Sequence, residues 1–134
     1  RMIFNRPLNV DEIAVSCPTL PIVICHAGYP WTDEALLISR FNPNVWIDLT
    51  FLETLEQVTG KEIIWDVLKQ TKTMIGCDRL IWGSEGAELG LEMYPDAGLE
   101  RMKVTIRKVL DAPFLTDQEK ENILCLNARR LFRV

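Results

Sequence analysis

The sequence predicts an α/β fold in which parallel strands alternate with helices. Three short apolar runs, at residues 21–28, 45–49 and 79–86, are typical of strands buried on both faces. Segments with the apolar spacing of amphipathic helices follow these runs. Because strands that alternate with helices form parallel sheets with right-handed crossovers, we expect one parallel sheet covered by helices.

The first unit is the run at 21–28 followed by a helix at 32–41. We expect Thr32 to cap this helix, and Asp33 and Glu34 place negative charge in its first turn, where the helix dipole favours it. Pro43 disfavours helical backbone in the residue before it, so the helix should end there.

The second unit joins a strand at 45–49, rich in β-branched and aromatic residues, to a helix at 61–75. Gly76 is a natural stop for that helix. The third unit pairs a strand at 79–86, closed by a glycine-rich turn, with a helix at 97–111. The order of elements therefore repeats strand and helix three times.

The two ends of the chain carry further signals. Thr116 and Glu119 have the spacing of a capping box, which predicts the start of a final helix. Residues 10–17 form a possible short helix before a proline. Residues 1–4 could be the tail of an earlier strand.

Composition limits the class of protein. With 134 residues, 48% hydrophobic and 25% charged, the chain has room for a single domain, residues 1–134, with a sizeable core. Its net charge of −4 makes it a poor partner for nucleic acid or an anionic membrane surface. It contains no apolar run near the roughly 18 residues that a membrane helix requires.

Four cysteines are present without a CxxC pair, which disfavours a zinc ribbon. Cys25 and Cys125 lie in apolar stretches and are expected to behave as small hydrophobic residues. A reduced, cytoplasmic setting is the simplest expectation.

Polar residues close each predicted strand. His26, the only histidine, ends the first; Asp48 and Thr50 end the second; Ser84 and Glu85 end the third. Ligands of parallel α/β sheets bind at the carboxyl ends of the strands. A histidine and a carboxylate at different strand ends are typical of a site that holds a metal ion and a water molecule.

Each of these residues also has a purely structural interpretation. His26 is either a site residue or a buried imidazole bonded to a backbone carbonyl, and Glu85 is either a site residue or a solvated loop carboxylate. For Asp48 we favour a buried group that bonds to neighbouring backbone. Tyr29 and Trp31 either line the mouth of a substrate site or cap the fold without taking part in chemistry.

Four segments, LPIVICHAG, NPNVWIDLT, DRLIWGSEG and NARRLF, together resemble the C-terminal half of amidohydrolase-related proteins. These are metal-dependent hydrolases and decarboxylases built on a TIM (β/α)8 barrel. The resemblance covers residues 18–133. It implies a partial barrel, approximately strands 6 to 8 with their helices.

The resemblance also implies site residues. Members typically bind one divalent metal, often zinc, through an HxH pair, a histidine on strand five and an aspartate on strand eight. His26 matches the strand-six histidine that positions or activates water, and Glu85, beside Ser84, stands where the family has its metal-binding aspartate. The chain departs from the pattern in this longer carboxylate. It also lacks the HxH pair and the strand-five histidine; if residues 1–5 end strand five, that histidine is lost or is replaced, for example by Asn5.

A complete barrel takes about 250 residues, and a catalytic zinc takes about three protein ligands. Three strands would also leave one sheet face bare and two edges open. We therefore expect the chain to be the second half of a larger enzyme, inactive alone, completed by a missing N-terminal half or by self-association.

The resulting hypothesis is part of a metal-dependent hydrolase that acts with metal-activated water on a small carboxylated or cyclic substrate. Glu85 would serve as metal ligand or general base, Tyr29, Trp31 and Ser84 would contact substrate, and His26 would orient the water. The alternatives are a non-oxidative decarboxylase of the same superfamily, a catalytically inactive barrel that binds ligands, and a complete protein with a flavodoxin-like open sheet. An HxH pair upstream would favour the enzyme.

Overall fold

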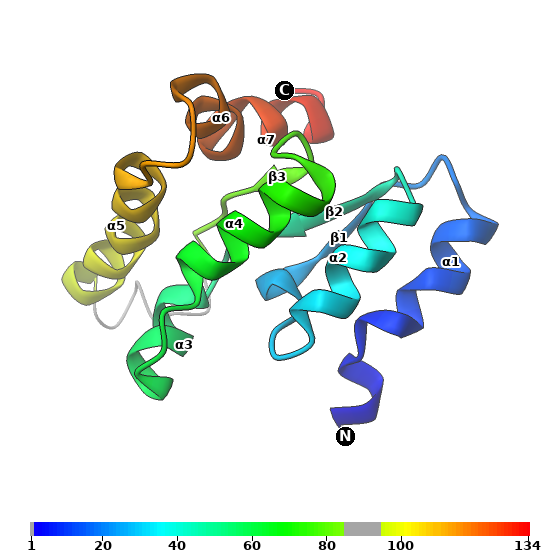
Figure 1. The fold of residues 1–134 in the computed structure, drawn as a ribbon, viewed down its shortest axis with the longest axis horizontal. Coiled ribbons are helices and arrows are strands. Elements are labelled where there is room, and N and C mark those ends of the chain that lie inside the picture. The colour runs from blue at the N-terminus through cyan, green and yellow to red at the C-terminus, as the bar shows by residue number, and fades with distance from the viewer. Residues whose placement is uncertain (1, 85–94) are drawn as a thin grey trace.

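A computed structural model describes residues 2–84 and 95–134, and the side chains of residues 4–84 and 99–134. Its three strands form one parallel sheet in the order β1–β2–β3 (Figure 1). They are β1 (Ile22–Ile24), β2 (Val45–Asp48) and β3 (Leu80–Ile81). The predicted parallel α/β fold is confirmed, and it is consistent with part of a (β/α)8 barrel.

The helices follow the strands in the predicted alternation. They are α1 (Asp11–Ser16), α2 (Thr32–Phe41), α3 (Leu52–Thr59), α4 (Ile64–Ile75), α5 (Pro95–Asp111), α6 (Asp117–Glu121) and α7 (Asn127–Phe132), with short 3-10 turns η1 (Met2–Asn5), η2 (Pro7–Val10) and η3 (Cys25–Gly28) and a π-helical turn η4 (Asn122–Leu126). Within the described ranges, no helix has both the length and the apolar character that crossing a membrane requires.

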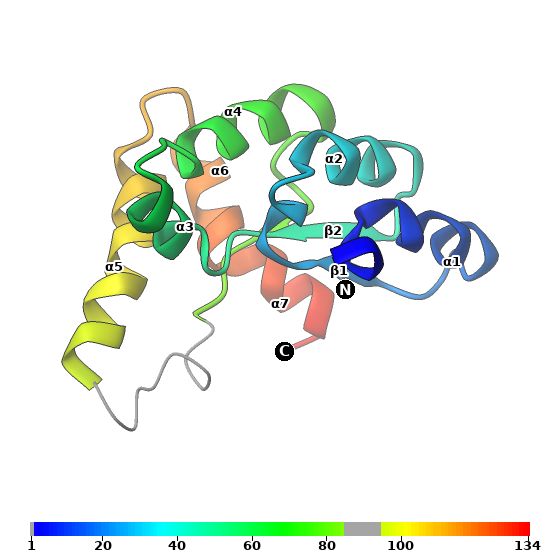
Figure 2. The same cartoon turned by 90° about the horizontal axis from the view of Figure 1, so that it is seen from below.

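The sheet lies between two unequal layers. Figure 2 shows α2 and α4 on one side of it and α7 on the other. The side chains of Val45, Ile47 and Leu80 are fully buried in the core. Trp46, which points to the opposite face from its strand neighbours, is half-buried and lies 5.4 Å from the guanidinium of Arg130. One face is therefore fully packed, whereas the other is covered only in part.

The outer edge of β3 is covered by the C-terminal segment. The backbone N–H of Trp82 donates to the carbonyl of Ile123, 3.0 Å away. The buried amide of Asn127 donates to the carbonyls of Cys77 and Leu80, both at 2.7 Å. The NARRLF segment thus fixes β3, and the expectation that both sheet edges lie open is wrong for this edge.

Several predicted boundaries are corrected by the structure. Residues 2–5 form the turn η1 and not a strand tail, because a strand needs a hydrogen-bonded neighbour and the described residues supply none there. The strands are shorter than their apolar runs, so His26 lies in a turn beyond β1. Helix α3 was not predicted, because it is only eight residues long and its apolar spacing does not stand out.

Two helix starts differ in how well the sequence predicted them. The capping box of Thr116 and Glu119 is present at α6, with both reciprocal bonds formed. At α2, Thr32 is the first helical residue, and Trp31 occupies the cap position without a side-chain cap bond.

Cys25 and Cys125 are exposed, which corrects the expectation of apolar surroundings.

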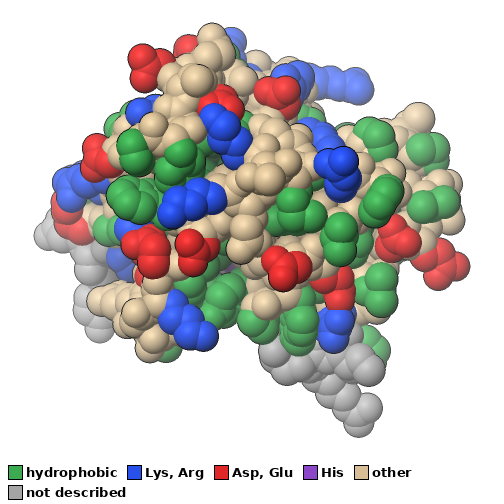
Figure 3. Space-filling view, viewed as in Figure 1, with side chains coloured by type: hydrophobic (Ala, Val, Ile, Leu, Met, Phe, Trp, Pro, Cys, Tyr) green, Lys and Arg blue, Asp and Glu red, His purple; other side chains and the backbone are tan. Residues whose placement is uncertain are grey.

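Acidic, basic and apolar side chains are interspersed on the face that carries α2 and α4. Figure 3 shows this mixture, without a large cluster of one sign among the described side chains of that face. A mixed surface of this kind produces no strong field of one sign.

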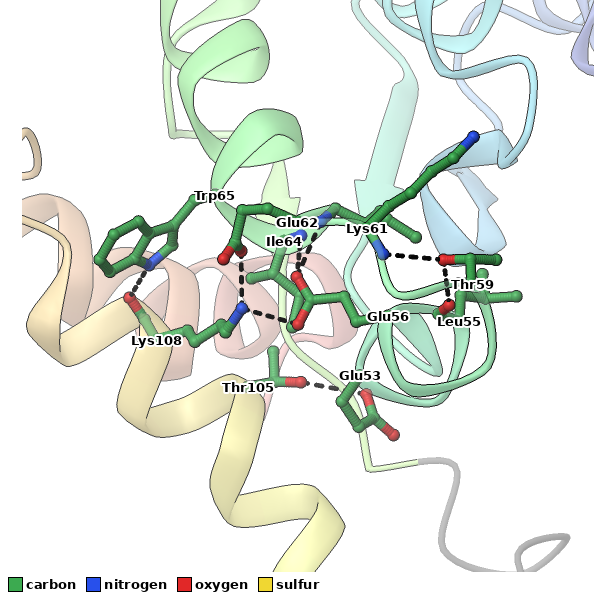
Figure 4. A network of polar contacts seen from close by, with 11 residues as sticks. Glu53, Leu55, Glu56, Thr59, Lys61, Glu62, Ile64, Trp65, Thr105 and Lys108 are labelled. Carbon is green, nitrogen blue, oxygen red and sulfur yellow. Dashed lines mark hydrogen bonds and ion pairs between the residues drawn. The ribbon is translucent and has the colours of Figure 1, made fainter.

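A polar network joins α3, α4 and α5 (Figure 4). One carboxylate oxygen of Glu56 accepts bonds from the backbone N–H groups of Ile63 and Ile64, at 2.8 and 2.7 Å, and so caps α4. The ammonium group of Lys108 lies between Glu56 and Glu62, 2.7 and 2.6 Å from their oxygens. The network holds α5, which carries the chain back from β3, against the rest of the fold.

The charged groups in this network shift one another's pKa values. A hydrogen bond from Lys108 holds the pKa of Glu62 below its usual range. Burial opposes the charge of Lys108, but hydrogen bonds to Glu56 and Glu62 outweigh it and raise the pKa of Lys108. A carboxyl whose folded pKa is lowered stabilises the fold above its unfolded pKa of about 4.3, and this contribution is lost as the pH falls through the folded pKa.

We predict that Lys108→Met lowers the free energy of unfolding at pH 7 by about 1 kcal/mol, because methionine keeps the packing of the stem and removes the ion pairs. The difference from the natural protein should shrink below about pH 4, where the carboxyls become protonated. Urea unfolding at pH 7 and pH 3.5 measures both effects. Lys103→Met, which removes the exposed pair with Glu100 on the same helix, is the control. Equal losses in the two variants would contradict the assignment.

A second prediction concerns Thr71 of α4, whose fully buried hydroxyl has no hydrogen-bond partner among the described residues. Thr71→Val replaces it with a methyl group of similar size, so the free energy of unfolding should rise by about 1 kcal/mol. Thr73→Val provides the control, because the Thr73 hydroxyl donates to the carbonyl of Lys69 at an exposed position. A loss of stability in Thr71→Val would show that the hydroxyl is satisfied.

Candidate functional site

The backbone is strained where β1 and β2 end. His26 and Ala27 adopt left-handed conformations, with φ of 56° and 49°, directly after β1. Phe51, shortly after β2, has a φ of 65°. Each such residue other than glycine costs about 1–3 kcal/mol, and such residues cluster at functional sites. Three of them on neighbouring strand ends therefore mark this edge of the sheet as the candidate site.

Asp48, the last residue of β2, holds these two strand ends together. Its side chain is buried, and one carboxylate oxygen, Oδ1, accepts three hydrogen bonds. The donors are the backbone N–H of His26 at 2.8 Å, and the backbone N–H and hydroxyl of Thr50 at 3.0 and 2.5 Å. The interpretation of Asp48 as a buried group bonded to neighbouring backbone is confirmed.

The imidazole of His26 lies against the residues that follow β2. Its Nδ1 atom is 3.0 Å from the carbonyl oxygen of Thr50 and 3.1 Å from the hydroxyl oxygen of Thr50. The ring of Phe51 is tilted against the imidazole, with 5.5 Å between centroids. The histidine is half-buried, and the contacts with Thr50 and Phe51 fix the position of its ring.

Two oxygens of Thr50 lie near the same nitrogen of this ring. The Thr50 hydroxyl donates its one proton to Asp48, and the carbonyl of Thr50 can only accept. Both oxygens can therefore act as acceptors toward Nδ1.

Two glycines allow the surrounding elements to approach this site. A Cβ atom on Gly83, just after β3, would lie 2.6 Å from Cγ2 of Thr50. A Cβ atom on Gly28, which has a φ of 67°, would lie 2.7 Å from Cβ of Ala35. The third strand therefore packs directly on Thr50, and α2 packs directly on the turn that follows His26.

A hollow of about 310 Å³ lies beside His26 at the outer edge of β1. Its lining includes His26 and Tyr29 together with residues of the N-terminal segment such as Asn5 and Arg6. A larger hollow of about 560 Å³ between α2 and α4 is also lined by Tyr29, but not by His26. We regard the smaller hollow as the candidate site, because it contains the strained histidine.

The predicted site residues are placed in different ways. His26 and Tyr29 meet at the hollow, whereas Trp31, absent from its described lining, stacks on the guanidinium of Arg6, 5.1 Å away. Arg6 in turn forms an ion pair with Glu34, which lowers the pKa of Glu34. Trp31 therefore fastens the N-terminal segment to α2 in this structure.

Of the two site residues predicted at the end of the third strand, Ser84 is among the described residues and Glu85 is not. Ser84 is half-buried and follows the glycine that packs on Thr50. Glu85, the predicted metal ligand and catalytic carboxylate, lies outside the described residues. Among the side chains that are described, no group of three or more His, Cys, Asp or Glu residues could hold a metal ion.

Thr50 is the functional candidate that the sequence did not single out. The sequence places it at a strand end, two residues after Asp48, but gives no sign that its hydroxyl bridges a carboxylate and the only histidine. The Asp-x-Thr spacing after a buried strand was the available signal. This spacing can be interpreted only when the register of the neighbouring strand is known.

Comparison with known proteins identifies one matching family. The family model described as "Amidohydrolase" matches residues 1–134. The chain is also similar to Protein fluG of Emericella nidulans, with 24% identity over 139 residues, covering 97% of this chain and 15% of that protein. The chain thus spans about one seventh of the length of that relative.

No solved structure gives a significant match. The family match, which covers the whole chain, agrees with the parallel sheet and with the polar residues at its strand ends. This protein chain belongs to the amidohydrolase family.

Proposed function

We propose that the chain forms part of the active site of a hydrolase in which His26 exchanges a proton with the reacting water through Nε2. The observation that carries this proposal is the hydrogen-bonded, left-handed histidine at the carboxyl end of a parallel strand. Membership of the amidohydrolase family supports a hydrolase-like activity. A small carboxylated or cyclic compound remains the proposed substrate class.

A positioned imidazole is suited to this task. General acid–base catalysis by a side chain contributes roughly 10²- to 10⁴-fold to a rate, provided that the group is held in the correct orientation and tautomer. His26 meets the structural part of this condition, because its backbone N–H and its Nδ1 atom are both held by residues at the end of β2. Tyr29 and Ser84 stay proposed contacts of the substrate, and Glu85 stays a proposed catalytic carboxylate.

The family generally uses divalent metals, and zinc is our proposal for the ion. The described residues do not by themselves fit such a site, because they contain no cluster of three suitable ligands. A complete site would need Glu85 and ligands from elsewhere in the whole protein. The role proposed for His26 does not depend on the ion.

The relative that the chain resembles is much longer than this chain. We propose that the outer edge of β1, where the hollow lies, is completed by further barrel units, either from the rest of the protein or from a second copy. A parallel strand pairs along such an edge through its backbone groups. A cytoplasmic location is likewise part of the proposal.

We predict that His26→Asn in the full-length protein lowers turnover by about 10²- to 10⁴-fold. Asparagine tolerates left-handed backbone better than most residues, so the turn should survive while Nε2 is lost. Hydrolysis of N-acyl amino acids, lactones and cyclic imides is measured, together with metal content. Cys125→Ser, at an exposed position of the C-terminal segment, is the control.

The possible outcomes separate the candidate functions. Equal turnover in His26→Asn and the control would exclude a catalytic role for His26. Release of CO₂ from a carboxylated substrate would assign the decarboxylase. Saturable binding of a test compound without turnover would assign the binding module.

A further inference from the structure

We propose that Asp48 and Thr50 are positioning residues that hold the His26 ring in the Nδ1-protonated tautomer, which makes Nε2 its proton-accepting atom. The catalytic consequence of this arrangement rests on the proposed function. The arrangement itself rests on hydrogen bonds among three described residues and can be tested without any substrate.

The first step is the orientation of the Thr50 hydroxyl. Oδ1 of Asp48 is 2.5 Å from Oγ1 of Thr50, and a carboxylate oxygen accepts hydrogen bonds. The single hydroxyl proton therefore points to Asp48. Bonds to an ionised acceptor are roughly twice as strong as those between neutral groups, so this orientation is favoured over donation to the imidazole.

The second step is the response of the imidazole. With its proton directed at Asp48, the Thr50 hydroxyl presents a lone pair to Nδ1 at 3.1 Å, beside the backbone carbonyl at 3.0 Å. Two acceptors then face one ring nitrogen. A protonated Nδ1 satisfies both, whereas a bare Nδ1 would oppose two oxygens with its own lone pair.

The third step is the rigidity of the three residues. Asp48 also accepts the backbone N–H of His26, so one carboxylate oxygen holds the histidine backbone directly and its ring through Thr50. Gly83 packs on Cγ2 of Thr50 so closely that no Cβ atom fits between them. This close packing limits the space in which Cγ2 of Thr50 can move.

The proton balance of the proposed step is simple. Nε2 takes one proton from the attacking water, the ring becomes an imidazolium that keeps its proton on Nδ1, and Nε2 returns the proton to the leaving group. The carboxylate of Asp48 and the oxygens of Thr50 stabilise the positive ring while it exists. Asp48 and Thr50 are unchanged at the end.

The test is the tautomer ratio of His26, measured by nitrogen-15 NMR of histidine-labelled full-length protein at a pH where the ring is neutral. The His26 signals are identified by their loss in His26→Asn. In the natural protein the Nδ1-protonated form should dominate. Thr50→Val removes one of the two acceptors, so the ratio of Nδ1-protonated to Nε2-protonated ring should fall about 2- to 10-fold. Thr50→Ser keeps the hydroxyl and should restore the ratio.

Asp48→Asn is the second variant, and it applies even if Thr50→Val fails to fold. Asparagine retains an oxygen that can accept from both backbone N–H groups, but it removes the charge that orients the Thr50 hydroxyl. The tautomer ratio should then fall in the same direction, by at least about 2-fold. A natural protein with Nε2 protonated, or an unchanged ratio in both Thr50→Val and Asp48→Asn, would overturn the proposal.

The same variants distinguish this proposal from the proposed function. If the enzyme hydrolyses a test compound, Thr50→Val should lower kcat with little change in KM, and Thr50→Ser should recover it. If the tautomer ratio shifts as expected while no compound is hydrolysed, the positioning role stands and the hydrolase assignment fails. If His26→Asn lowers kcat but the tautomer ratio does not change in Thr50→Val, the hydrolase assignment stands and the positioning role fails.

Discussion

A single carboxylate oxygen holds the site of this protein together. Oδ1 of Asp48 accepts the backbone N–H of His26 across from the neighbouring strand, and both the backbone N–H and the hydroxyl of Thr50. These bonds compensate for left-handed backbone at His26 and Phe51, which would otherwise relax. Because the oxygen lies at the end of the central strand, the parallel register of β1 and β2 and the position of the imidazole depend on the same contact.

The architecture was predictable because its signals are local. Apolar runs of the length of a strand and segments of helical period give the alternation of elements, and parallel pairing follows from that alternation. Features that depend on a distant neighbour were not predictable. Residues 2–5 adopt a helical turn where a strand tail was expected, and α3 is too short for its apolar spacing to stand out. Trp31 shows the same limit, because its partner Arg6 lies 25 positions earlier in the chain.

The site was predictable in part for the same reason. The position of His26 at a strand end and the backbone-bonding role of Asp48 follow from the sequence, since the carboxyl ends of parallel strands share one edge. The bridging role of Thr50 depends on the register of two strands and on the close packing of Gly83. Neither can be read from the order of residues alone. Family membership adds a reaction class but says nothing of this bridge.

The most direct test of this account is a neutron diffraction structure of the deuterium-exchanged full-length protein, which locates exchangeable protons at His26 and Thr50. The account predicts deuterium on Nδ1 of His26 and a Thr50 hydroxyl directed at Oδ1 of Asp48. Deuterium on Nε2 with a bare Nδ1 in a neutral ring, or a Thr50 hydroxyl turned toward the imidazole, would contradict it.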